Sequence, residues 1–193
     1  MSDDTVPSPA VRRANPMAIR GDRQHFGLLA RLFHWLTPLL LIGSFGLIFS
    51  VSWLPAGPDR VSIVRLHRTI GIIVLSLTLL RLLWRLADRH PAALGPRASR
   101  WLARLVHGAF YGLLLCTPLL GWSYTNARGH VLYIFGQPLP TLIFKDEYLS
   151  RLAISWHEWC AYTLLGLIGL HVLAALWHQF WLKDGAIRRI WRD

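Results

Sequence analysis

Four long stretches of this 193-residue chain carry almost no charge, and they limit what the chain can fold into. Residues 32–58, 105–127 and 159–182 contain no charged side chain. A shorter apolar stretch at 69–80 is flanked by arginines whose long side chains can reach lipid headgroups. About 20 apolar residues span the ~30 Å hydrocarbon core of a bilayer as a helix. We therefore predict an all-α fold, an integral membrane four-helix bundle.

The predicted helices cover residues 29–53, 61–86, 100–124 and 151–182, in an up-down-up-down arrangement. The first 27 residues are polar and carry arginines, and they contain no apolar run of signal-peptide length. We therefore expect residues 1–27 to form a disordered cytoplasmic arm. Residues 28–193 are expected to form a single membrane domain.

Lysine and arginine residues are divided unequally between the two predicted sides of the membrane. Fifteen lie in the N-terminal arm, the second connection and the tail, against six on the other side. Because the cytoplasmic side of a membrane protein is enriched in such residues, both termini are expected to be cytoplasmic. The net charge of +11 then reflects this topology and contacts with lipid headgroups, and it requires no nucleic-acid partner.

Two histidines of the last predicted helix, His157 and His171, lie fourteen residues apart. In a helix their side chains fall within about 40° of each other, roughly 21 Å apart along the axis. Imidazoles inside hydrocarbon are costly, and they mark ion paths, proton relays or metal centres. The helix thus offers one ligand near each face of the membrane.

Histidines of the other helices pair with these two by depth. On the outer side the partner of His157 is His67. On the inner side His34 and His107 both lie at the depth of His171, and spacing alone does not choose between them. One such histidine would be explained as a packing residue, but matched outer and inner pairs indicate two metal centres across the bilayer.

The positions of the other histidines and of the acidic residues limit which kind of metal centre is possible. His178 lies about 31 Å from His157 along the helix axis, close to the whole thickness of the hydrocarbon, so His171 is the better buried ligand. The acidic residues Asp59 and Glu158 fall at the outer edge, so a divalent-cation transporter or proton-driven carrier would lack its carboxylates. Haem iron needs only two axial imidazoles.

Short motifs recur in a fixed order along residues 28–193. They are Arg31-Leu-Phe-His34-Trp35, His67 with Gly71, Leu102-Ala-Arg-Leu-Val-His107, Pro118 with Gly121, Asn126-Ala-Arg-Gly129, Ser155-Trp-His-Glu158, and Gly169-Leu-His171 followed by His178. In this order the chain resembles the bacterial cytochrome b561 family of dihaem four-helix proteins of the inner membrane. The resemblance implies one haem b held by His34 and His171 on the cytoplasmic side. A second haem b would be held by His67 and His157 on the periplasmic side, leaving His107 nearby but not ligating.

The resemblance also implies an activity, the oxidation of superoxide outside and the reduction of ubiquinone within the membrane. A cationic rim around the outer haem is expected to attract a small anion; its members are Arg65, Arg68, Arg128, Lys145 and Arg151. On the inner side, His178 and Arg81 are the candidates for contact with a quinone carbonyl. The connection at 123–150 is expected to lie on the outer interface and partly cover the outer haem.

Two other classes of function stay open at this stage. One is an electron-transfer subunit that docks a hydrogenase or dehydrogenase as its redox partner protein. The other is a haem-free transporter or sensor, which would show no visible absorption after purification. The sequence does not identify the electron donor.

Overall fold

A computed structural model describes residues 18–21, 26–88, 97–185 and 187–191. Most of the predicted arm, and the connection at 89–96, lie outside these residues. Within the arm, the Gly21 amide donates to the Asp88 carboxylate at 3.2 Å and the Leu28 amide donates to the Ala18 carbonyl at 2.8 Å. Because most of residues 1–27 lie outside the described part of the chain, the disorder predicted for them stays a prediction.

Four long helices make up the fold, and each is long and apolar enough to cross a membrane. They are α1 (Leu28–Ser50), α2 (Pro58–Ala87), α3 (Arg97–Ala127) and α4 (Glu147–Trp177). A 3₁₀ turn, η1 (Val51–Trp53), extends α1, a π-helical segment, η2 (His178–Leu182), extends α4, and a short helix, α5 (Arg188–Trp191), follows. The prediction of a four-helix membrane bundle is confirmed, and all four predicted spans coincide with helices.

The helix boundaries differ most around the connection predicted at 123–150. Helix α3 continues to Ala127 because Gly129, at φ +81°, closes its end, with the Gly129 amide donating to the Asn126 carbonyl at 2.7 Å. Helix α4 begins four residues early because the Asp146 carboxylate accepts a hydrogen bond from the Leu149 amide at 2.8 Å. The connection is therefore shorter than predicted.

A small hairpin fills the middle of this connection. Strand β1 (Tyr133–Ile134) pairs antiparallel with β2 (Gln137–Pro138), and β1 packs against α2. Its two turn residues, Phe135 and Gly136, both have positive φ, as a type I′ turn requires. Asn126, which is buried, ties the loop to the end of α3: its amide donates to the His130 carbonyl at 3.0 Å, and its oxygen accepts from the Leu142 amide at 2.9 Å.

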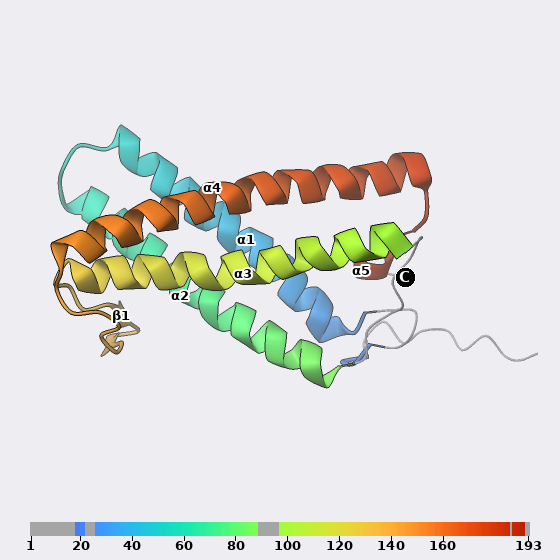
Figure 1. Cartoon of the computed structure of the whole chain (residues 1–193), viewed down its shortest axis with the longest axis horizontal. Coiled ribbons are helices and arrows are strands. Elements are labelled where there is room, and N and C mark those ends of the chain that lie inside the picture. The colour runs from blue at the N-terminus through green and yellow to red at the C-terminus, as the bar shows by residue number, and fades with distance from the viewer. Residues whose placement is uncertain (1–17, 22–25, 89–96, 186, 192–193) are drawn as a thin grey trace, which may run out of the picture.

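The helices pack in sequence order, α1 with α2, α2 with α3, and α3 with α4. Helices α3 and α4 run antiparallel and side by side along most of their length (Figure 1). Among the described residues, α4 packs mainly on α3. A cavity lies between the helices and is lined by residues of all four of them, including Phe45, His67, Leu114 and His157.

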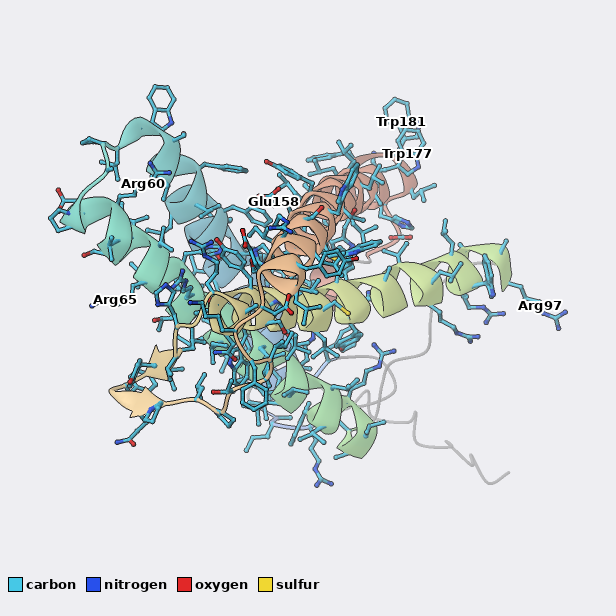
Figure 2. All side chains as sticks on the ribbon, turned by 60° about the vertical axis from the view of Figure 1, so that its left-hand side comes forward. Arg60, Arg65, Arg97, Glu158, Trp177 and Trp181 are labelled. Atoms are coloured by element: carbon cyan, nitrogen blue, oxygen red, sulfur yellow. The ribbon has the colours of Figure 1, made fainter. Side chains whose placement is uncertain are left out.

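Both ends of the described chain lie at the same end of the bundle, where α1 begins and the C-terminal segment returns (Figure 1). Figure 2 shows Arg65 near one end of the bundle, with Arg97 and Trp181 toward the other. We call the end that carries Arg65 the outer end and the end that carries both termini the inner end.

Candidate haem sites

Helix α4 carries one histidine of each site, His157 toward the outer end and His171 toward the inner end. Leu164, midway between them in the sequence, is only 2% exposed. It forms an apolar core with Val74 of α2 and Leu114 of α3. This core separates the two sites, so each site lies in its own low-dielectric environment.

The outer site joins α2 to α4 through two imidazoles. The ring centres of His67 and His157 are 6.2 Å apart and the rings are inclined by 83°. The His157 Nδ1 donates to the Thr117 carbonyl of α3 at 2.8 Å. The His67 Nδ1 lies 3.1 Å from the Ser44 carbonyl and 3.0 Å from the Ser44 hydroxyl of α1. Such bonds orient a metal-binding imidazole and leave its Nε2 as the ligand atom.

The separation of the two rings matches a metal held between them. Two metal–nitrogen bonds of about 2 Å, with each nitrogen about 1.2 Å from its ring centre, require ring centres roughly 6.4 Å apart. In the described part of the chain, no three His, Cys, Asp or Glu side chains are arranged so that they could hold one metal ion by themselves. Two opposed imidazoles suit the axial positions of haem iron, whose other four ligands come from the macrocycle.

A cavity of about 220 Å³ opens beside these two rings. Its walls are mostly apolar and include Phe45, Val74 and Leu114. Thr117 also lines it, and its buried hydroxyl has no hydrogen-bond partner among the described residues. An apolar cavity with opposed imidazoles and one unsatisfied polar group fits an amphipathic macrocycle.

Gly121 of α3 makes room for the His157 ring. A Cβ at this position would lie 3.1 Å from both Cε1 and Nδ1 of His157, closer than ordinary van der Waals contact. Gly121→Ala is expected to push the ring off the Thr117 carbonyl and to lower the occupancy of the outer haem several-fold, because loss of such a supporting bond typically costs about 10–100-fold in metal affinity. Haem content per purified chain measures the effect.

Gly112 provides the matched control for this substitution. It lies on the same helix, and a Cβ there would meet nothing within 4 Å. Gly112→Ala should retain the full haem content, and an equal loss in both variants would show that Gly121 has no specific role at the site.

The inner site contains three imidazoles rather than two. The ring centre of His171 lies 6.4 Å from that of His34 on α1 and 6.2 Å from that of His107 on α3. Phe110, one turn after His107, packs against His171 at 5.4 Å. The choice between His34 and His107 that the sequence leaves open is therefore not made by these distances either.

The C-terminal segment covers the α1 side of the inner site. The Trp35 ring, next to His34, meets the Trp191 ring of α5 edge-on at 4.9 Å, and its Nε1 donates to the Ile190 carbonyl at 3.3 Å. Positive φ values at Lys183 and Gly185 turn the chain back toward α1. The sequence gives no indication of this cover, because it depends on a turn after the last span.

The two residues predicted to contact a quinone occupy different surroundings. Arg81 lies within electrostatic reach of His34 and His171, and its guanidinium stacks over the Tyr111 ring at 5.7 Å. His178 opens the π-helical segment, and its Nδ1 donates to the Asp184 carboxylate at 2.6 Å. Arg81 is thus at the inner site, whereas His178 is anchored beyond it by the turn.

The predicted cationic rim divides into three groups. Arg68 follows His67 and lies near Arg65 and Tyr124, within electrostatic reach of both. Lys145 lays its side chain over Gly129, the residue that follows Arg128 in the sequence, at the end of α3. Arg151 is paired with Glu147 one turn before it at 3.1 Å, and its charge is largely compensated.

The positions of Ser44 and the Thr117 carbonyl are functional features that sequence reasoning missed. Both act through hydrogen bonds to the ligand imidazoles. Backbone carbonyls have no sequence signature. For Gly121 a signal was present, since it lies three residues after Pro118 in one of the motifs.

A four-helix membrane protein with neighbouring histidine rings at two depths has the features of a transmembrane cytochrome b. Comparison with known proteins identifies the family within this class. The family model of prokaryotic cytochrome b561 matches residues 25–193, and this chain belongs to that family. It is therefore a multi-pass bacterial membrane protein with an electron-transfer function, and its family binds haem b.

Individual relatives cover most of the chain. Cytochrome b561 homolog 2 of Escherichia coli is 27% identical over 184 residues, which are 90% of this chain and 95% of the relative. Probable superoxide oxidase CybB of Yersinia pestis is 30% identical over 160 residues, 81% of this chain and 90% of the relative. Cytochrome b561 homolog 1 of Escherichia coli is 26% identical, with 81% and 91% covered.

Proposed function

We propose that this protein transfers electrons through the bacterial inner membrane from superoxide on the periplasmic side to ubiquinone within the bilayer. The main support for this proposal is the position of His157 and His171 on α4, at two separate sites. At each site the ring centre of another histidine lies at about the distance expected for two imidazoles bound to one haem iron. In this proposal His67 and His157 hold one haem b, and His34 and His171 hold the second. Bound haem would supply the one-electron chemistry.

The overall reaction balances as two superoxide anions, one ubiquinone and two protons giving two dioxygen molecules and one ubiquinol. Superoxide is suggested by the name of the Yersinia pestis relative, and by the cations at the outer end. Arg65, Arg68, Arg128 and Lys145 would draw a small anion toward the outer site. Arg81 would hold a quinone oxygen at the inner site. Both termini are placed in the cytoplasm on the basis of the charge distribution.

Stopped-flow mixing of the purified, haem-loaded protein with superoxide tests this proposal. A fast change in haem absorbance, followed by a stoichiometric yield of ubiquinol when ubiquinone is present, is the expected result. If superoxide leaves the absorbance unchanged while a purified redox partner protein changes it, the chain is an electron-transfer subunit instead. Protein without visible absorption would exclude both functions.

We extend the proposed quinone contact from Arg81 to His178, in the turn beyond the inner site, and His178→Ala tests this second contact. The imidazole is fixed by Asp184 and lies seven residues beyond His171 on the same helix. Its loss should slow ubiquinone-dependent reoxidation by about tenfold, the effect of one hydrogen bond to a charged or polarised group. Superoxide-driven reduction and haem content should not change. Gln179→Ala, on the neighbouring position, is the control, and reoxidation at the parental rate in His178→Ala would place the quinone contact elsewhere.

A further inference from the structure

The inner site has one imidazole more than an axially ligated iron can use. His171 would be a ligand in either arrangement, because the rings of both His34 and His107 lie next to its own. Their ring centres lie 6.4 Å and 6.2 Å from that of His171, and both values fit the roughly 6.4 Å expected for two axial imidazoles. At the outer site, among the described residues, His67 is the histidine whose ring contacts His157.

A hydrogen bond to the backbone of α3 also orients the His107 ring for metal binding. Its Nδ1 donates to the Ala103 carbonyl, four residues earlier on α3, at 2.5 Å. This is the same kind of anchor that His67 finds in the Ser44 carbonyl and His157 in the Thr117 carbonyl. With Nδ1 carrying the hydrogen, Nε2 keeps its lone pair and can bind a metal.

The helices around His107 support its approach to His171. His107 and Phe110 are three residues apart and so share one face of α3, and both rings contact His171. Helices α3 and α4 are the most extensively packed pair in the described bundle, so this face is held against α4. His34 approaches His171 from α1, a helix that packs chiefly on α2.

We propose that the inner haem has two alternative ligands opposite His171, and that His107 binds the iron when His34 does not. The proposal rests on the two-haem assignment above and extends it to a residue outside the ligand set that the family resemblance implies. His34 and His107 are close enough to interact electrostatically, so a ring that leaves the iron stays beside the site.

Four variants test this proposal through haem content rather than activity. They are His34→Ala, His34→Gln, His107→Ala and the double variant His34→Ala/His107→Ala. Each single variant is expected to keep two haems per chain by pyridine haemochrome analysis, and to keep a low-spin bis-imidazole signal for the inner haem by electron paramagnetic resonance. The double variant is expected to keep one haem. His34→Gln, which preserves side-chain volume, guards against misfolding of the alanine variant.

His67→Ala is the matched control, because no second histidine is available at the outer site among the described residues; it should fall to one haem per chain. The proposal is overturned if His34→Ala and His34→Gln both fall to one haem, or keep an inner haem that is high-spin and five-coordinate. That result with two haems in the parent protein leaves the proposed function intact. A parent protein without haem would defeat the proposed function itself.

Discussion

Replacing His157 with alanine is expected to remove one of two haems from the purified protein, and replacing His171 is expected to remove the other. Each residue is the α4 half of a bis-imidazole pair, and its loss leaves the iron with a single protein ligand. Loss of a supporting bond alone typically costs about 10–100-fold in metal affinity, so loss of the ligand itself should empty the site. The haem-to-protein ratio should fall from two to one in each variant.

The loss of one haem should be distinguishable from the loss of the other, and each loss should affect only its own site. Leu164 and its apolar neighbours separate the sites, so removal of one haem should leave the absorption spectrum of the other unchanged. His130→Ala is a control at the outer end, since His130 is exposed and its described contact with Asn126 uses only the backbone carbonyl. A parent protein with one haem, or a His157 or His171 variant that keeps two, would contradict the assignment of two haems to these histidine pairs.

The four helices and the depth of the paired histidines were accessible from the sequence. A helix must be apolar over nearly its whole length to cross the hydrocarbon core of a bilayer. Such runs can be read from the sequence without knowing which helices pack together. Likewise, the fourteen-residue spacing of His157 and His171 places both on one helix face whatever the neighbouring helices do. These properties depend on one helix at a time.

Other features were not predicted from the sequence, some because they are local details of one helix end and one because it depends on two helices at once. The length of the outer connection was overestimated because a local cap, Asp146, and a left-handed Gly129 extend the helices on both sides. The compensation of Arg151 by Glu147 is an i,i+4 pair that was visible in the sequence but was not weighed. The roles of His34 and His107 depend on how α1 and α3 are rotated about their axes, which periodicity does not fix.

Neutralising Arg128 and Lys145 together, as Arg128→Gln/Lys145→Gln, is expected to slow haem reduction by superoxide about fourfold at low ionic strength. Two unit charges about 10 Å from an incoming anion in water contribute roughly 0.4 kcal/mol each, and ~0.8 kcal/mol corresponds to that factor. Both side chains are exposed, and the stem of Lys145 lies over Gly129, the neighbour of Arg128 in the sequence. Stopped-flow rates at several salt concentrations measure the effect.

The salt dependence of the reduction rate tests electrostatic attraction of superoxide more directly than the rate itself. At 0.1 M salt the Debye length is about 10 Å, so the parent rate should fall with added salt, whereas the rate of the double variant should change less. Arg97→Gln/Arg104→Gln removes the same charge from the opposite end of the bundle, where Figure 2 shows Arg97, and should leave both the rate and its salt dependence unchanged. Haem content should be equal in all three proteins. Equal slowing by both pairs would mean that superoxide responds to the net charge of the chain, and an unchanged rate in Arg128→Gln/Lys145→Gln would mean that the anion approaches by another route.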